Sequence, residues 1–268
     1  MAQIKTYGIV LDYRDFSETS RMLTLFTPGM GLLSASAKGC RRIKSPLYAG
    51  SELYTFAEYV ISENRGKYTL IQADGVESFY GLRSNIDSLT AAAQMIEFTR
   101  AIAVEGTESA ALFVLLSRCL EQVAEYPENN PYMISLYYQM QALQNEGLLP
   151  DFRYCANCGR PASSAPGISP AAGGRLCHPC RNLFTDTRVL SAGTWKMLSL
   201  FRSSPLEMVP RLKMSAVTLR ETENVWPELA ASRLEKALRS PSYIAKIRKH
   251  ALRTADTENN RGVSQKPL

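Results

Sequence analysis

The chain has 268 residues, of which 45% are hydrophobic and 21% charged, so it is long enough for two domains, and its composition excludes a fibre or a largely disordered protein. The net charge of +6 suggests a polyanionic partner such as nucleic acid, although an excess of this size also serves solubility. The sequence has neither the pattern of a secretory leader nor the roughly 18 uninterrupted apolar residues of a membrane span, so we expect a cytoplasmic protein without a membrane partner.

Residues 3–80 have the alternating pattern of β-strands. Apolar and polar residues alternate over 3–15, 21–28, 31–39, 51–64 and 67–79, and turn signals with Gly or Pro separate these stretches. Five short strands over so few residues suggest a small barrel, for which the OB-fold is the natural candidate. Residues 1–80 are therefore predicted to form an OB-fold nucleic-acid-binding domain.

A basic segment joins the third and fourth predicted strands. Residues 38–45, KGCRRIKS, contain four cations and no acid. On an OB barrel such a loop flanks the face that binds single strands, where cations follow the phosphate backbone and nearby aromatic residues stack on bases. A solvated surface loop has the same composition, so both interpretations stay open. The mixed-charge segment 14–21, RDFSETSR, is equally well explained as a salt-bridged turn.

After Gly81 the apolar period changes from that of a strand to that of an α-helix. Three amphipathic helices are predicted, over about residues 86–103, over about 112–123, and from Asn130-Pro131 to Gly147. Residues 81–150 carry three Lys and Arg against eight Asp and Glu, whereas residues 151–268 carry nineteen against nine. The chain is therefore divided between an acidic helical part and a basic C-terminal part.

Two cysteine pairs, Cys155-Ala-Asn-Cys158 and Cys177-His-Pro-Cys180, are separated by eighteen residues. Two C-x2-C turns can bring four thiolates around one tetrahedral zinc ion, and Gly159 suits the first turn. Because cysteine fills all four positions, the predicted zinc is structural rather than catalytic. Two disulfides or free buried thiols are the alternative. His178 is expected to be a bystander, and Cys40 and Cys119 are expected to be small buried thiols.

The remaining segments complete the predicted organisation. The loop between the cysteine pairs has no apolar pattern, so we expect the metal to fix its ends. Ser191 is predicted to cap a helix through Phe201, and another helix to run from about Pro227 to Leu238. The fold class is thus α+β multidomain: an OB-fold β-barrel followed by an α-helical domain (81–150 and 185–250), which carries an inserted four-cysteine zinc-finger module (151–184).

The C-terminal end is basic and polar. Residues 251–268 have little to bury and are predicted to be a disordered tail. Seven basic residues near it are suited to phosphates or an acidic peptide, and equally to a solvated helix face: Arg233, Lys236, Arg239, Lys246, Arg248, Lys249 and Arg253.

Catalytic motifs are mostly absent from the sequence. There are only two histidines, and neither a Gly-x4-Gly-Lys-Ser/Thr phosphate loop nor a dinucleotide fingerprint occurs. We therefore expect a protein that is not an enzyme.

Two stretches carry a resemblance to a known family. The first is Gly8-Ile9-Val10-Leu11-x-x-Arg14-Asp15-x-x-Glu18-x-x-Arg21-x-Leu23-Thr24-Leu25-Phe26-Thr27, followed by Gly31 and Lys38-Gly39-x-Arg41-Arg42-x-Lys44-Ser45. The second is Gly147-Leu148-Leu149-Pro150, which leads into Cys155-x2-Cys158-Gly159. Both stretches, and the order of the predicted parts, resemble the bacterial RecO family of recombination mediators. The resemblance is specific over residues 8–45 and 147–180 and architectural elsewhere.

The resemblance implies a non-catalytic protein of recombinational repair in the RecF pathway. Such a protein binds single- and double-stranded DNA, anneals complementary strands, and assists recombinase loading onto strands covered by single-strand-binding protein (SSB). The implied protein partners are RecR and the acidic C-terminal tail of SSB, and the implied location is the bacterial cytoplasm at the nucleoid. By position, the resemblance assigns DNA contacts to Arg14, Arg21, Lys38, Arg41, Arg42 and Lys44.

Two other classes of protein stay open at this point. An RNA-binding or translation-associated OB-fold and zinc protein would prefer structured RNA to single-stranded DNA. A metal-dependent enzyme would lose turnover, but keep its fold, when alanine replaces Cys177.

Overall fold

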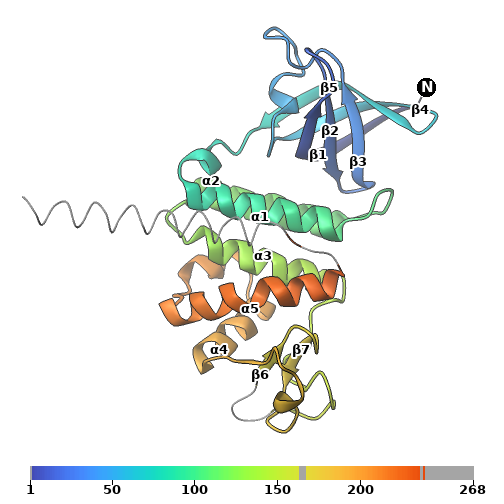
Figure 1. Cartoon of the computed structure of the whole chain (residues 1–268). Helices are drawn as coiled ribbons and strands as arrows, with labels where there is room; N and C mark the ends of the chain where they lie inside the picture. Colours follow the sequence, from blue (N-terminus) through green and yellow to red (C-terminus); the bar gives the residue numbers. More distant parts are fainter. Residues whose placement is uncertain (1, 163–166, 236–237, 239–268) are drawn as a thin grey trace, which may run out of the picture.

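The computed structural model describes residues 2–162, 167–235 and 238 of the chain. The barrel forms one end of the molecule in Figure 1, the long helices cross its middle, and a small module with short strands lies at the other end. The predicted α+β class, an N-terminal barrel followed by helices, is confirmed. Within the described ranges, no helix is both long and apolar enough to cross a membrane.

Five strands form a closed barrel, as the OB-fold prediction requires. They are β1 (Ala2–Asp15), β2 (Arg21–Thr27), β3 (Gly31–Ala37), β4 (Phe56–Asn64) and β5 (Lys67–Glu77). The order around the barrel is β1-β2-β3-β5-β4, with β3 and β5 as a short parallel pair. Side chains alternate across the wall, so Leu23, Leu25, Leu33 and Ala35 are buried inside it.

The fourth strand begins later than predicted. β4 starts at Phe56 rather than at residue 51, because Ala49–Ser51 forms a 3-10 turn and Tyr54 has a φ of 65°. A residue in the left-handed region interrupts an extended strand. The first part of the predicted strand is therefore the end of the long connection from β3.

Five α-helices follow the barrel in the described part of the chain. They are α1 (Ile86–Ile102), α2 (Ala110–Glu125), α3 (Pro131–Asn145), α4 (Ala192–Ser203) and α5 (Ala216–Leu234). The side chains of Asn85, Asn130 and Ser191 accept hydrogen bonds from the first turns of α1, α3 and α4. The predicted helices near 86–103, 112–123 and 131–147, and the helix capped by Ser191, are thus present. Short 3-10 helices cover Tyr80–Arg83, Cys180–Leu183 and Leu206–Arg211.

The last described helix differs from its prediction. α5 begins after Ser215, whose Oγ accepts from Thr218 N at 3.1 Å, and Pro227 lies inside it rather than at its start. The buried face of Val225, Trp226 and Leu229 holds this helix against the bundle. Packing of that face compensates for the one backbone donor that the proline lacks.

A carboxylate joins α4 to α5. Glu221 accepts hydrogen bonds from Ser191 N and Oγ, both at 2.9 Å, and from the Thr194 hydroxyl. Burial raises the pKa of Glu221, but these donors outweigh burial and lower the pKa overall. The carboxylate therefore stays charged at the start of α4, where the helix dipole favours it.

The barrel is fixed to the helices by direct packing. The ring of Phe113 on α2 lies 5.8 Å from Phe26 and 5.9 Å from Phe56, measured between centroids. A Cβ on Gly31 would lie 2.1 Å from the carbonyl oxygen of Val104, so only glycine permits this approach of β3 to the α1–α2 connection. The same apolar core thus includes side chains of the barrel and of the bundle.

The cysteine segment contains a small sheet. Strands β6 (Gly167–Ser169), β7 (Gly174–Leu176) and β8 (Arg188–Val189) pair in the order β7-β6-β8. Ile168 is fully buried in the main core. The expectation that nothing apolar holds this loop is therefore wrong, because one isoleucine and a short ladder attach it to the helical domain.

Some of the predicted features fall outside the described residues. The tail 251–268 lies there, as do Lys236, Arg239, Lys246, Arg248, Lys249 and Arg253. Arg233 is described, and its Nε donates to Leu148 O at 2.9 Å. The domain boundaries at residues 80, 150, 184 and 250 stay predictions.

Candidate nucleic-acid interface and metal centre

The segment Lys38–Tyr48, which we call the basic loop, is anchored at both ends. Cys40 and Leu47 are buried in the core of the barrel. Gly39 has a φ of 68°, a conformation that favours glycine, and turns closed at Arg42 N, Ser45 N and Tyr48 N follow it with bonds of 3.2, 2.8 and 3.1 Å. The exposed residues between the two anchors therefore have a defined backbone.

The basic loop is also bonded to the β1–β2 loop. Thr19 O accepts from Arg41 N at 3.0 Å, and Ser20 Oγ accepts from Gly39 N at 3.1 Å. The Arg41 side chain lies 3.2 Å from Ser17 O and 3.3 Å from a carboxylate oxygen of Asp15. Both loops thus form one rim of the barrel, and the charge of Arg41 is partly neutralised there.

Four of the six predicted contact residues carry uncommitted charge. Arg14, Lys38, Arg42 and Lys44 are exposed, and their side chains have no hydrogen bond or ion pair to any other residue in the described ranges. Arg14 lies on the wall of the barrel, and the other three cations lie on the basic loop at its rim. Such cations can neutralise phosphates without first breaking a protein contact.

A groove on the outer wall of the barrel contains Arg14 and a residue from the helical domain. It is lined by Asp12, Tyr13, Arg14, Met22, Thr24, Ser34 and Arg100. Arg100 lies on α1, and its Nη1 is 2.9 Å from a carboxylate oxygen of Asp12, yet nearly half of its side chain is exposed. Sequence reasoning gave Arg100 no role, because only the packing of α1 on the barrel brings it near Arg14.

Arg21 differs from the other predicted contacts. Only 11% of its side chain is exposed, and Nη1 donates to Glu52 at 2.8 Å and to Ser51 O at 3.1 Å. Its Nε donates to Asp15 at 3.2 Å, and the guanidinium lies 3.9 Å from the centroid of the Tyr13 ring. Arg21 therefore joins β1, β2 and the Ser51-Glu52 segment that follows the basic loop, and its Nε and Nη1 already donate within the protein.

Replacing Arg21 by glutamine is expected to destabilise the barrel while leaving the salt dependence of DNA binding unchanged. The free energy of unfolding should fall by about 1–2 kcal/mol, since the lost bonds involve charged but partly solvated partners. Urea unfolding measures the loss of stability. The salt dependence of DNA affinity shows whether Arg21 contacts a phosphate. A reduced salt slope at wild-type stability would instead mean that Arg21 touches phosphate.

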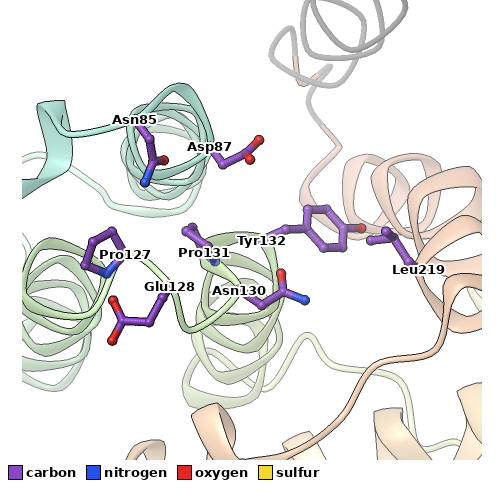
Figure 2. Close-up of a pocket in the computed structure, with 8 residues that line it drawn as sticks. All are labelled: Asn85, Asp87, Pro127, Glu128, Asn130, Pro131, Tyr132 and Leu219. Atoms are coloured by element: carbon purple, nitrogen blue, oxygen red, sulfur yellow. The ribbon is translucent and has the colours of Figure 1, made fainter. Parts of the chain in front are cut away.

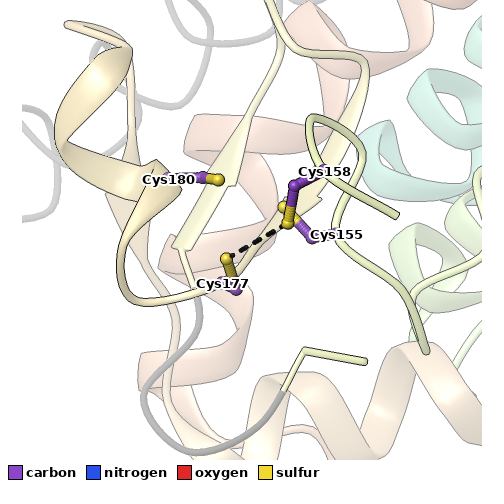
Figure 3. Close-up of side chains that lie close together, drawn as sticks. All are labelled: Cys155, Cys158, Cys177 and Cys180. Atoms are coloured by element: carbon purple, nitrogen blue, oxygen red, sulfur yellow. Dashed lines mark hydrogen bonds between the residues drawn. The ribbon is translucent and has the colours of Figure 1, made fainter. Parts of the chain in front are cut away.

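The four predicted cysteines lie together in the module. Cys155 and Cys158 come from one turn, and Cys177 and Cys180 from the other (Figure 3). All four sulfur atoms lie within 4.8 Å of one another, and the Cys158 and Cys177 Sγ atoms are 3.7 Å apart. Thiolates bound to tetrahedral zinc at about 2.3 Å are about 3.8 Å apart, so the geometry fits such an ion.

Polar neighbours favour the thiolate form of Cys155, whereas the pKa of Cys177 is raised to about 11. A backbone hydrogen bond from Cys180 lowers the pKa of Cys177, but burial and the other three cysteines outweigh this bond. Asn157 Nδ2 lies 3.3 Å from the Cys180 sulfur. Burial raises the pKa of Cys155, but hydrogen bonds from the backbone N–H groups of Cys177, Cys158 and Asn157 lower it to about 6. His178 is exposed and outside the cluster. The donor set that could hold a metal is therefore four sulfur atoms.

A second pocket lies where α1 and α3 begin, and its chemistry differs from that of the rim. Asn85 and Asp87 line one side and Glu128 and Asn130 the other, with Leu219 of α5 at its edge (Figure 2). Two carboxylates in this pocket disfavour phosphate. This pocket is therefore not a candidate phosphate site, unlike the barrel rim.

Comparison with known proteins agrees with both parts of the structure. The family description "Recombination protein O N terminal" matches residues 1–79, which contain the barrel. The description "Recombination protein O C terminal" matches residues 83–242, which contain the helices and the cysteine cluster.

Curated relatives match most of the chain. The DNA repair protein RecO of Alkaliphilus metalliredigens is 32% identical over 212 residues, which are 79% of this chain and 86% of the relative. The protein of the same name from Acetivibrio thermocellus is 29% identical over 236 residues, 88% of this chain and 94% of the relative. The Moorella thermoacetica protein is 29% identical over 245 residues, 90% of each chain. The chain therefore belongs to the RecO family of recombination proteins.

Proposed function

We propose that this RecO family member acts in DNA repair and recombination by binding DNA through the rim of its barrel. It binds single- and double-stranded DNA, anneals complementary strands, and helps to load the recombinase onto strands covered by SSB in the RecF pathway. The observation that carries this proposal is the set of exposed, uncommitted cations on the anchored basic loop and the adjoining wall: Arg14, Lys38, Arg42 and Lys44. Such binding would hold the protein at the nucleoid.

The chemistry of these cations suits strand annealing. Lysine and arginine directed at phosphates neutralise the repulsion between two strands without occupying the base edges that must pair. The exposed aromatic Phe16, on the loop bonded to the basic loop, adds a surface on which a base could stack. Binding through these groups would be nearly independent of sequence.

The cysteine cluster is proposed to hold one structural zinc ion. Four sulfur ligands leave no coordination position for water or substrate, which supports a protein that acts by binding rather than by catalysis. The zinc would fix the two C-x2-C turns, and with them Ile168 and the short sheet that pack on the helical domain.

RecR and the acidic C-terminal tail of SSB are the proposed protein partners. A pocket between α2, α3 and the 3-10 helix Leu206–Arg211 supports an acidic peptide partner, because Val114, Leu115 and Leu206 line it together with Arg118. Arg118 is paired with Glu207. A carboxylate of the tail would replace Glu207 at this guanidinium.

Strand annealing provides the direct test of the proposed function. The full chain is expected to accelerate pairing of two complementary, fluorescently labelled strands already covered by SSB, and to do so without ATP. The same protein should bind an unstructured DNA strand at least as tightly as a structured RNA of equal length. No acceleration, together with a preference for the RNA, would overturn the proposal in favour of an RNA-binding function.

A further inference from the structure

Ile43, in the middle of the basic loop, is almost completely exposed. Its relative exposure is 94%, and its neighbours Arg42 and Lys44 are exposed as well. An aliphatic side chain in this position contributes no packing to the fold. Packing within the free protein therefore does not explain why this position holds an isoleucine.

The backbone holds Ile43 outward. Ser45 N donates to Arg42 O at 2.8 Å, which closes a turn with Ile43 and Lys44 at its two corners. Turn corners usually contain Gly, Pro, Asn, Asp or Ser, so a β-branched aliphatic residue is unusual there. Because Cys40 and Leu47 anchor both sides of the turn, Ile43 could fold back onto the barrel only if the turn were broken.

A similar triplet elsewhere in the chain behaves differently. Arg211-Leu212-Lys213 also places an aliphatic residue between two exposed cations, but Leu212 is partly buried and packs against the core of the helical domain. The exposure of Ile43 is therefore not a necessary result of having charged neighbours.

We propose that Ile43 is a wedge that inserts between neighbouring bases at the junction of single- and double-stranded DNA. This inference rests on the proposed function, since the cations of the loop must first bind the backbone. Proteins that bind the minor groove through arginine and lysine frequently insert an apolar side chain, isoleucine among them, between two bases and partly unstack them. Arg42 and Lys44, on either side of Ile43, are placed to supply those phosphate contacts.

A junction is the preferred target because its last base pair is stacked on one side only. Insertion there sacrifices less stacking than insertion into a continuous duplex, whereas the apolar area of Ile43 that leaves water is the same. The wedge adds less to the affinity for an isolated single strand, since the bases of that strand are already free to unstack. The wedge thus predicts a preference for junctions that cations alone would not give.

The test uses a duplex with a single-stranded overhang and 2-aminopurine in its last base pair. Binding of the full chain is expected to raise the fluorescence of 2-aminopurine, as unstacking does. Ile43→Ser should abolish this rise and lower the preference for the junction over single-stranded DNA about tenfold, a ratio of the size expected for burying one such side chain. Ile43→Met, which keeps an aliphatic side chain, should retain both properties.

Two controls separate the possible outcomes. Ile86→Ser removes an isoleucine that is 54% exposed at the start of α1 and should behave as the wild type. If Ile43→Ser keeps the fluorescence rise, or weakens binding to every DNA equally, the wedge is wrong. If the double variant Arg42→Gln, Lys44→Gln binds all DNA as the wild type does, the loop does not bind DNA, and the proposed function is contradicted together with the wedge. If that double variant loses binding, but Ile43→Ser keeps both the fluorescence rise and the preference for the junction, the wedge is wrong and the proposed function of the loop stands.

Discussion

Replacing Cys177 by serine is expected to release the metal ion and to unfold the cysteine module. Structural zinc sites carry roughly 10–16 kcal/mol of apparent binding free energy in isolated fingers, most of which is folding free energy. If only about 3 kcal/mol of this reaches the whole protein, the melting temperature should fall by about 6–12 °C. Bound zinc measured by elemental analysis should drop from one equivalent to none, and differential scanning calorimetry should register the lower transition.

The loss should extend beyond the module because its contacts enter the helical domain. Arg175 on β7 donates to Phe152 O at 2.7 Å, and its guanidinium lies 4.7 Å from the centroid of the Trp195 ring on α4. Ile168 is buried in the main core. When the two C-x2-C turns separate, these groups lose their position, and α4 loses part of its packing.

Cys119→Ala is the matched control. This thiol is fully buried on α2 and is not part of the cluster of four sulfur atoms, so it is not a candidate ligand. The variant should keep one equivalent of zinc and lose only the small packing contribution of one sulfur atom. A Cys177→Ser protein that keeps its metal and melts with the wild type would mean that the cluster does not stabilise the fold.

Local sequence patterns predicted the elements of this structure well. Period-two alternation predicted a five-strand barrel, and Asn130 and Ser191 lie where their predicted helices begin. The cysteine spacing predicted the cluster, since the four sulfur atoms converge. These features are determined by residues close in the sequence or by a repeated motif. They can therefore be predicted without knowledge of the tertiary fold.

Features set by tertiary contact were not predictable from the sequence. Arg21 and Arg42 are the same residue type in the same family motif, yet Arg21 is half-buried and paired with Asp15 and Glu52 while Arg42 faces solvent. Arg100 reaches the barrel groove only because α1 packs beside β1. The start of α5 was missed because a proline inside the helix resembles a helix start, and only the buried face of Trp226 and Leu229 decides otherwise.

Replacing Arg42 and Lys44 together by glutamine is expected to weaken DNA binding strongly and to reduce its dependence on salt. Both cations are exposed, and neither has an ion pair within the described residues, so their loss should not unfold the loop. Each phosphate contact on a single strand adds about 0.7 to the slope of log affinity against log salt, so the slope should become shallower by about 1.4. Two contacts of about 1 kcal/mol each correspond to roughly 30-fold weaker binding at low salt.

The matched control is the double variant Arg211→Gln, Lys213→Gln. These two residues have the same spacing and the same change of net charge, but they lie in the helical domain, away from the barrel rim. Fluorescence anisotropy with an unstructured labelled strand at several salt concentrations measures both affinity and slope. If both double variants lose affinity equally, the effect is one of net charge rather than of a binding site. A smaller slope only in the Arg42, Lys44 variant would identify the basic loop as a place where phosphates bind, since counterion release depends on local contacts and not on total charge.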